Sequence, residues 1–464
     1  MAKMDWWVSM PKVELHAHLN GSIRDSTLLE LARELGNKGL VCFPDVEHVI
    51  LKDDRSLTEV FKLFDLIHIL TTDHETVTRI TKEVIEDFAA ENVVYLELRT
   101  TPKKNVSKGM NKKSYMEAVL EGLRAVTTVE VDIFSEHNFD SPANASTFAR
   151  GNDCASNGTG KKKIYVRLLL SIDRRETTEA AMETVKLALE MRHLGVVGID
   201  LSGNPVIGEW LTFLPALEFA KEQGLLITLH CGEVSNPVEI HAMLDFLPSR
   251  IGHACCFGEA EWAKLKSLKI PVEICLTSNI RTETISSVDI HHFADLYNSG
   301  HPIVLCTDDS GVFSTSVSGE YSLASSSFGI QKRAMFQLAK NAINFIFAGH
   351  RNEMNTSDLV EVGTKGSIGS LVRKEIEYFR RLELECNWAF IESQKTNYMK
   401  MDSSGCSCWP SFESCRMKWK KKRRINGGCL PAMCFMVDVS EGNSEKEIIQ
   451  FSDSETDLGR VLWL

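Results

Sequence analysis

Two histidines, His16 and His18, stand one residue apart at the end of a short apolar stretch, residues 13–19. In a β-strand, residues i and i+2 point to the same side, so both imidazoles would project from one strand end. That spacing suits two nitrogen ligands of a single metal ion. Because the same pattern also occurs in purely structural strands, the metal hypothesis depends on whether the rest of the chain supplies further ligands and an acid.

Further candidate ligands and proton-transfer groups follow other apolar runs. His230 and Glu233 follow one run, His253 ends the next, and Asp308 and Asp309 follow the last. Three imidazoles with one carboxylate, from either Asp308 or Asp309, form a ligand set that suits Zn²⁺, with Fe²⁺ or Co²⁺ as alternatives and one position open to water. Such an ion lowers the pKa of its water toward neutrality and so produces a nucleophile.

The same residues supply the proton-transfer groups of a metal-assisted hydrolase. Glu233, three residues after His230, could reach a bound substrate as a general acid. His253 could orient the nucleophile or take its proton. Each residue also has a structural interpretation: the histidines as core residues, Glu233 as a surface carboxylate, and the two aspartates as a helix N-cap pair. Their combination favours the catalytic hypothesis.

The elements that must position these residues are eight short apolar runs, each followed by helix-like sequence. The runs lie at residues 13–19, 93–98, 164–172, 196–201, 226–229, 250–255, 271–276 and 302–306. Strands that are apolar throughout are buried on both faces, as in a parallel sheet covered by helices. The alternation predicts an α/β fold, a (β/α)8 TIM-type barrel, with an open doubly wound sheet as the alternative. Barrel enzymes carry their catalytic residues at the carboxyl ends of the strands, where these candidates stand.

Two stretches do not fit a barrel. Residues 135–163 are rich in Asn, Ser, Gly and Thr and predict a long disordered insertion before the third strand. The strand–helix rhythm stops near residue 350, and residues 351–464 are rich in Cys and carry a basic run at 418–424. We therefore predict a barrel domain over residues 1–350, with a flexible insertion, and an atypical, poorly ordered C-terminal extension.

Composition limits the class of protein. The chain has 464 residues, a formal net charge of −11 and 43% hydrophobic residues, which indicates a soluble globular protein and argues against nucleic-acid binding by the whole surface. The N-terminus lacks the apolar core of a signal peptide, and no run approaches the roughly 18 apolar residues of a membrane-spanning helix. We expect a cytosolic monomer with reduced thiols that binds a small molecule, and neither a membrane nor stable nucleic acid.

Five motifs, at residues 15–22, 229–233, 250–253, 276–279 and 306–309, resemble the adenosine/AMP deaminase family in order and spacing over about residues 10–350. The resemblance implies one zinc ion with the ligands His16, His18, His230 and Asp308. It implies that Glu233 protonates the purine N1 and that His253 acts on the nucleophile that attacks C6. It also implies a hydrogen bond from Asp309 to N7 and a contact of the Gly203 backbone with N3.

Asn20 separates this chain from nucleoside-specific members of the family, which carry Asp at that position against the free 5′-hydroxyl. A neutral amide removes a like charge that would oppose a 5′-phosphate. Together with residues 96–103 and 172–175, this makes the chain most similar to the adenosine-deaminase-like subgroup, the N6-methyl-AMP deaminases. The resemblance implies further substrate contacts from His18, His68, Thr100, Thr101, Pro102, Lys103 and Asp173.

The reaction implied is hydrolysis of N6-methyl-AMP to IMP and methylamine. Two alternatives stay open from the sequence: deamination of free adenosine, and a catalytically silent protein that binds a metal or a nucleotide. Two of the phosphate-side residues also keep a structural interpretation, since His68 could pack within an apolar helix and Lys103 could be a solvated charge. Arg174 and Arg175 could instead pair with Glu176 or Glu179.

Overall fold

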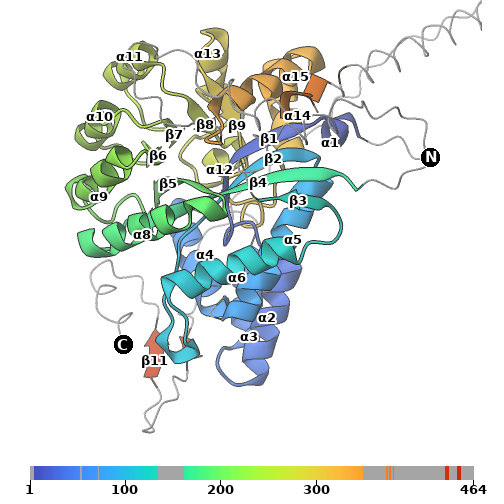
Figure 1. Ribbon diagram of the computed structural model, residues 1–464, viewed down its shortest axis with the longest axis vertical. Coiled ribbons are helices and arrows are strands. Elements are labelled where there is room, and N and C mark those ends of the chain that lie inside the picture. The colour runs from blue at the N-terminus through green and yellow to red at the C-terminus, as the bar shows by residue number, and fades with distance from the viewer. Residues whose placement is uncertain are drawn as a thin grey trace, which may run out of the picture.

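Eight parallel strands form the centre of the molecule, and helices surround them (Figure 1). The computed structural model describes residues 5–52, 55–71, 73–133 and 161–348, together with residues 372–374, 376–377 and 380 and two short strands further along. In the order of the sheet, the strands are β1 (Lys12–His18), β2 (Val93–Thr100), β4 (Lys163–Asp173), β5 (Val196–Ser202), β6 (Leu226–Cys231), β7 (Arg250–His253), β8 (Val272–Ile274) and β9 (Ile303–Leu305). Each strand overlaps one of the eight predicted apolar runs.

The barrel closes between β1 and β9. Asp308, three residues after β9, forms a parallel bridge with β1. Its N–H donates to the His16 carbonyl at 2.8 Å, and its carbonyl accepts the His18 N–H at 3.0 Å. The buried Glu14 carboxylate accepts both the N–H and the hydroxyl of Thr307 at 3.0 Å. The prediction of a (β/α)8 barrel is therefore confirmed, and the open doubly wound sheet is excluded.

The helices pack one apolar face against the strands. In α5, the buried positions Val77, Ile80, Val84 and Phe88 recur every three or four residues, as an amphipathic helix requires. The helices are α1 (Trp6–Ser9), α2 (Asp25–Asn37), α3 (Phe43–Ile50), α4 (Leu57–Leu70), α5 (His74–Ala90), α6 (Lys112–Arg124), α8 (Thr178–Glu190), α9 (Trp210–Glu222), α10 (Pro237–Asp245), α11 (Glu259–Leu268), α12 (Leu276–Arg281), α13 (Phe293–Asn298), α14 (Val317–Phe328) and α15 (Lys332–Asn341).

Two elements were not predicted. The short strand β3 (Glu130–Asp132) pairs with the first three residues of β4. Its residues are partly exposed, so the sequence contains no apolar run that would predict it. The helix α12 begins at Leu276, where the sequence predicts the last residue of a strand. Residues 277–279 therefore lie on the first turns of a helix and not on a strand end. Of the predicted insertion, residues 135–160 lie outside the described part of the chain, and β4 begins at Lys163.

Some residues beyond the predicted boundary at 350 pack on the barrel. Val372 and Ile376 are helical and buried, and Lys340 of α15 forms an ion pair with Glu377 at 2.8 Å. Further along, β10 (Cys434–Val437) pairs antiparallel with β11 (Glu447–Gln450). Most of residues 351–464 lie outside the described part of the chain, so the predicted nature of the extension stays a prediction.

A network of charged side chains fills the inside of the barrel. Arg250 contacts Glu97 and Glu273, each at 2.6 Å, and Arg99 contacts Glu273 at 2.9 Å and Asp200 at 3.1 Å. The side chains of all five are at most 1% exposed. Since a buried charge is tolerated only with a partner, removal of one member would leave the others uncompensated. This network connects strands on opposite sides of the barrel.

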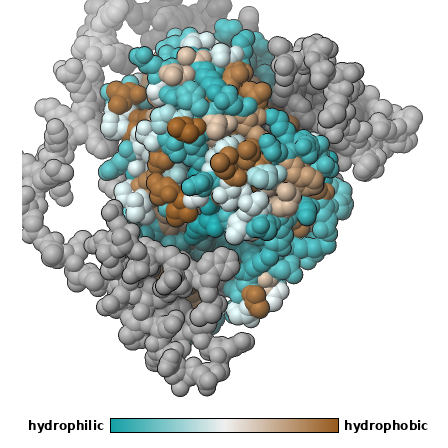
Figure 2. Space-filling model, turned by 90° about the vertical axis from the view of Figure 1, so that its left-hand side faces the viewer, coloured by the Kyte–Doolittle hydropathy of each residue, from teal (hydrophilic) through white to brown (hydrophobic). Residues whose placement is uncertain are grey.

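The described part of the outer face that Figure 2 shows is mainly hydrophilic. Figure 2 shows one face of the molecule, on which apolar side chains form small separate groups between hydrophilic residues. Exposed apolar residues include Val206, Leu211 and Val238. Among the described residues, we find no helix that combines the length and the apolar character needed to span a membrane.

Candidate active site

Three histidines and an aspartate come together at the carboxyl ends of β1, β6 and β9. One ligand-type atom from each of His16, His18, His230 and Asp308 lies within 4.8 Å of the other three. Nε2 of His16 and Nε2 of His18 lie 3.2 and 3.3 Å from Oδ1 of Asp308. Nε2 of His18 lies 3.1 Å from Nε2 of His230. Four donor atoms that converge in this way are the arrangement expected around one ion.

Buried carboxylates fix the outer nitrogens of two of these histidines. Nδ1 of His16 lies 2.6 Å from Glu273, and Nδ1 of His230 lies 3.1 Å from Asp200. When a carboxylate accepts the Nδ1 proton, the lone pair of Nε2 is directed at the centre of the group. Nε2 of His16 is buried and has no hydrogen-bond partner among the described residues, as expected of an atom that binds a metal. The donor set therefore fits Zn²⁺ or a similar divalent ion.

The backbone at the site is strained and closely packed. His253 and Asp308 adopt left-handed φ angles of 67° and 65°, which cost on the order of 1–3 kcal/mol each for residues other than glycine. A Cβ at Gly252 would lie 2.8 Å from Cε1 of His16, and a Cβ at Gly21 would lie 1.6 Å from Oδ1 of Asp309. Only glycine at these two positions lets the backbone approach the site side chains so closely.

Glu233 and His253 face each other beside the histidine group. Oε1 of Glu233 lies 3.8 Å from Nε2 of His253, and this nitrogen lies 4.0 Å from Oδ2 of Asp308. Burial raises the pKa of Glu233 to about 7, so a protonated carboxyl is available near neutral pH. Burial lowers the pKa of His253 well below its usual value, so this ring is neutral. The pair thus offers an acid and a neutral imidazole.

The adjacent aspartates differ in charge. Burial alone would raise the pKa of Asp308, but its close contacts with the imidazoles of His16 and His18 bring it well below the usual value. Burial and the neighbouring Asp308 raise the pKa of Asp309 well above its usual value. Asp308 is therefore the charged member of the candidate metal group, and Asp309 is a neutral carboxyl that can donate a hydrogen bond. The N-cap alternative fails, because the next helix, α14, begins only at Val317.

Asn20 is buried and held by hydroxyl groups on both sides. Its Nδ2 donates to Oγ1 of Thr71 at 3.4 Å, and the Tyr115 hydroxyl donates to its Oδ1 at 3.2 Å. Thr71 gives its only hydroxyl proton to the Ile67 carbonyl at 2.8 Å, so its oxygen must accept from Asn20, which fixes the orientation of the amide. Thr100 lies 2.7 Å from the Tyr115 hydroxyl. The second Nδ2 proton is left for a ligand.

Two basic residues, Lys103 and Arg175, follow the ends of β2 and β4, and His68 of α4 lies near both. Nζ of Lys103 is buried and has no hydrogen-bond partner among the described residues. Burial lowers the pKa of Lys103 to about 7. Burial, and to a lesser degree the charges of Lys103 and Arg175, lower the pKa of His68 well below its usual value. Arg175 pairs with Asp173 at 2.8 Å and with Asp65 at 3.1 Å.

A buried ammonium without a partner is costly, and an anionic ligand would offset that cost. The interpretation of Lys103 as a solvated charge fits poorly with its buried Nζ. The packing interpretation of His68 stays open, because its ring lies 6.4 Å from that of Phe64 on the same helix. Neither arginine pairs as the sequence suggested, since Arg174 contacts Glu239 at 2.6 Å.

The remaining predicted substrate residues line the same ends of the strands. Gly203 follows β5 with a φ of 100°, and a Cβ there would lie 2.9 Å from Oδ1 of Asp173. Thr101 and Pro102 continue from β2 toward Lys103, and Pro102 is buried. The structure thus brings together residues from loops far apart in the sequence, at the end of the barrel that holds the histidine group.

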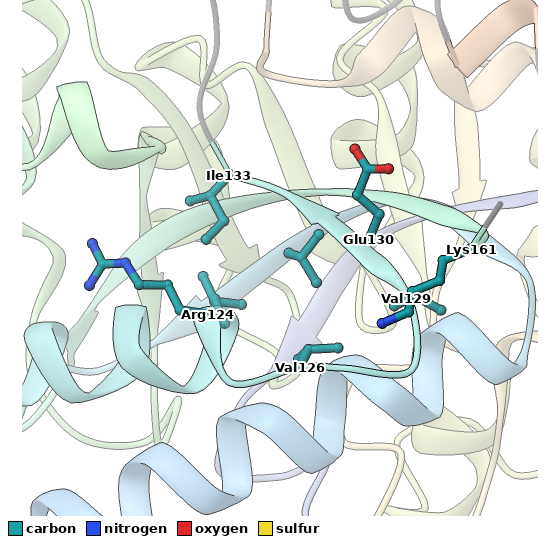
Figure 3. Close-up of a pocket in the computed structure, with 8 residues that line it drawn as sticks. Arg124, Val126, Val129, Glu130, Ile133 and Lys161 are labelled. Atoms are coloured by element: carbon teal, nitrogen blue, oxygen red, sulfur yellow. The ribbon is translucent and has the colours of Figure 1, made fainter. Parts of the chain in front are cut away.

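A hollow lies at the other end of β4 (Figure 3). This cavity of about 510 Å³ is lined by the end of α6, by β3 and by Lys161. The hollow lies beside β3, which pairs with the first residues of β4, whereas the candidate site residue Asp173 is the last residue of β4. The hollow is therefore remote from the histidine group. Its lining includes Arg124 and Glu130 but no group of metal-ligand type among the described residues.

Several residues that shape the site were missed by the sequence analysis. Glu273 and Asp200 hold the ligand histidines, and Thr71 and Tyr115 hold Asn20. A signal for the two carboxylates exists, because each is a charge inside an apolar strand. No comparable signal marks Thr71 or Tyr115, which lie at the end of α4 and within α6.

Comparisons with known proteins identify relatives that span most of the barrel. The sequence profile of the adenosine deaminase family matches residues 11–361. The chain is 69% identical over 345 residues to the N6-mAMP deaminase of Arabidopsis thaliana, an alignment that covers 74% of this chain and 94% of the relative. It is 39% identical over 357 residues to the N6-methyl-AMP deaminase of Homo sapiens, covering 75% and 91% of the two chains.

A solved structure agrees with these sequence matches. The crystal structure of Arabidopsis ADAL complexed with IMP matches this chain with a TM-score of 0.71 and 62% identity, and the match covers 81% of this chain and 98% of that one. The family depends on a metal ion, and this chain carries a suitable group of three histidines and an aspartate. The chain therefore belongs to the adenosine deaminase family and is a hydrolytic deaminase that acts on C–N bonds.

Proposed function

We propose that this protein is a zinc-dependent deaminase of N6-methyl-AMP, which it hydrolyses to IMP and methylamine. The observation that carries the choice of a nucleotide is the buried Nζ of Lys103, which lacks a hydrogen-bond partner among the described residues. A 5′-phosphate would supply that partner, whereas a nucleoside would not. The identity of 69% with a plant N6-mAMP deaminase supports the same choice.

The residues that would hold zinc are His16, His18, His230 and Asp308, whose donor atoms converge within 4.8 Å. When bound, zinc supplies Lewis-acid activation of water in such a site. Glu273 and Asp200 keep two of the imidazoles in the tautomer that presents Nε2.

The purine is activated by protonation and by hydrogen bonds. Glu233, with its pKa raised to about 7, donates a proton to N1 and so makes C6 more electrophilic. Asp309, neutral because its pKa is raised, donates a hydrogen bond to N7. Water adds to C6, the bond from C6 to the exocyclic nitrogen breaks, and methylamine leaves with a proton. The carbonyl that remains at C6 is that of IMP.

The phosphate end of the substrate would lie against Lys103, His68 and the free amide proton of Asn20. Arg175 adds positive charge there, although Asp173 and Asp65 partly balance it. His18, Thr100, Thr101, Pro102, Asp173 and Gly203 would complete the contacts with ribose and base. Location in the cytosol and action as a monomer without nucleic acid remain our predictions.

Steady-state kinetics on N6-methyl-AMP and N6-methyladenosine test the proposal with the full chain loaded with zinc. We expect kcat/KM for the nucleotide to exceed that for the nucleoside by at least 100-fold. A preference for N6-methyladenosine or adenosine would instead identify a nucleoside deaminase. No turnover of any of these compounds by protein with one equivalent of zinc would support the catalytically silent alternative.

A further inference from the structure

A chain of buried hydrogen bonds runs from a backbone N–H to His253. The N–H of Phe293, the first residue of α13, donates to Nδ1 of His291 at 3.0 Å. Nε2 of His291 lies 3.2 Å from Oδ1 of Asn279, and Nδ2 of Asn279 lies 3.0 Å from Nδ1 of His253. His291, Asn279 and His253 are at most 2% exposed, so water does not compete for these contacts.

The direction of every bond in this chain follows from its first donor. A backbone N–H can only donate, so Nδ1 of His291 accepts and carries no proton. Burial lowers the pKa of His291 to about 2, so its ring is neutral and its single proton is on Nε2. That proton is donated to Oδ1 of Asn279, which leaves the Nδ2 group of the amide facing His253. Nδ2 donates, so Nδ1 of His253 accepts, and the proton of His253 is on Nε2.

The Nε2–H of His253 points into the site. This nitrogen lies 3.8 Å from Glu233 and 4.0 Å from Asp308, and it has no hydrogen-bond partner among the described residues. In this position, His253 would donate a hydrogen bond to the oxygen that attacks C6, and it could not accept a proton from that oxygen. Of the two roles open from the sequence, orientation of the nucleophile and removal of its proton, this geometry selects the first.

We propose that His291 is a positioning residue that acts through Asn279 to hold His253 as the Nε2–H tautomer. The inference rests on the proposed deaminase function for its catalytic meaning, but the tautomer itself is a property of the free protein. His291 lies 38 residues beyond His253 in the sequence and contacts no metal ligand in the described structure. The turn before α13 places the N–H of Phe293 against the His291 ring, and this contact fixes the direction of the hydrogen bonds that follow.

Substitutions that remove or keep the donor at position 291 separate positioning from packing. His291→Phe keeps a planar ring but removes the donor, so Asn279 can turn its Oδ1 toward His253 and favour the Nδ1–H tautomer. We expect kcat to fall about 10- to 100-fold with KM and bound zinc nearly unchanged. His291→Gln restores an N–H donor of similar reach, and we expect kcat within fivefold of the wild type. His301→Phe is the control, because it also removes a buried imidazole that bonds a carbonyl, that of Ile270 at 2.8 Å. Unlike His291, it takes no part in the hydrogen bonds that lead through Asn279 to His253.

The tautomer can be observed without any substrate. A neutron structure of the wild-type protein should show the deuteron of His253 on Nε2 and that of His291 on Nε2. A deuteron on Nδ1 of His253 would overturn the proposal, even if His291→Phe did not fold. Equal kcat for His291→Phe and the wild type would overturn it too, as would failure of His291→Gln to recover activity while zinc content and melting temperature match the wild type. If N6-methyl-AMP proved to be the wrong substrate, the neutron result would stand, and kinetics would be measured on the compound that is turned over.

Discussion

Replacement of Lys103 by Met tests two effects of this side chain: its contribution to substrate binding and its cost to the stability of the folded protein. Nζ of Lys103 is buried without a hydrogen-bond partner among the described residues, and burial lowers its pKa from 10.5 to about 7. Met has a similar length and no charge. The substitution should therefore weaken binding of the nucleotide and at the same time stabilise the free protein.

The effect on binding follows from the hydrogen bond that is lost. A hydrogen bond to a charged group contributes about 1.5–3 kcal/mol, which corresponds to a change of roughly 10- to 150-fold. We expect KM for N6-methyl-AMP to rise by that factor. We also expect KM for N6-methyladenosine to change less than threefold, because the nucleoside has no phosphate.

The effect on stability follows from the pKa. The pKa of Lys103 in the folded protein is lower than in the unfolded chain, so the unfolded chain binds more protons between pH 7 and 10.5. The penalty is fully present below about pH 7 and fades as the pH rises toward 10.5. At about 1.4 kcal/mol per pKa unit, its upper limit is ~5 kcal/mol. Lys103→Met should therefore raise the free energy of unfolding at pH 6 by a few kcal/mol, and by less at pH 9.

The same pKa predicts a pH dependence of binding. Above about pH 7 the free protein must take up a proton at Lys103 to bind the phosphate, so KM for the nucleotide should rise with pH by up to tenfold per unit. Lys103→Met should remove this slope. KM of the nucleoside should not share it.

Lys104→Met is the matched control, because Lys104 is half exposed and pairs with Glu183 at 2.7 Å. Surface pairs of this kind contribute about 0–1 kcal/mol, so its kinetics and melting temperature should match the wild type. Chemical denaturation at pH 6 and 9 and kinetics on both substrates are the assays. If Lys103→Met bound the nucleotide normally, or lost stability at pH 6, the interpretation of Lys103 as a phosphate ligand would be wrong.

Three further substitutions test other parts of the site. Asn20→Asp should fold, since the Tyr115 hydroxyl can donate to a carboxylate and the Thr71 hydroxyl can turn from the Ile67 carbonyl to do the same. Its charge should reduce the ratio of kcat/KM for N6-methyl-AMP over N6-methyladenosine about 10- to 100-fold, and an unchanged ratio would contradict the role of Asn20 in selecting the nucleotide. Glu233→Gln should lower kcat by about 10²–10⁴ while calorimetry shows IMP binding within threefold of the wild type, and a loss of binding instead of kcat would refute the general-acid role. Glu273→Gln removes the charge that balances Arg99 and Arg250, so the free energy of unfolding should fall by about 3–5 kcal/mol. It should also weaken zinc binding about 10- to 100-fold in competition with a chelating dye, and normal zinc affinity would argue against control of His16 by Glu273.

The barrel could be predicted from the sequence because its strands are buried on both faces. Strands such as β2 and β6 are mainly apolar in sequence, and their spacing leaves room for a helix after each. The start of α12 could not be predicted, since Leu276 continues the apolar run of β8. The three residues of β3 are partly exposed and depend on pairing with β4, so they have no local signature.

The candidate metal ligands could be predicted because imidazoles at strand ends are informative in themselves. The residues that hold them could not, because a hydrogen bond joins positions far apart in the chain. Glu273 is 257 residues from His16, and only the closed barrel brings them within 2.6 Å. Similarly, the choice between Asp308 and Asp309 depends on which carboxylate meets His16 and His18, which the sequence leaves open.

Product analysis with N6-methyl-AMP tests the central claim most directly. Full-length protein loaded with one equivalent of zinc is incubated with N6-methyl-AMP, and IMP and methylamine are both quantified, with Glu233→Gln as the control. We predict equal amounts of IMP and methylamine, one of each per substrate consumed, with formation stopped by a chelator and restored by zinc. Wild-type protein that binds zinc but forms no IMP, or that forms inosine from adenosine faster than IMP from N6-methyl-AMP, would contradict the account.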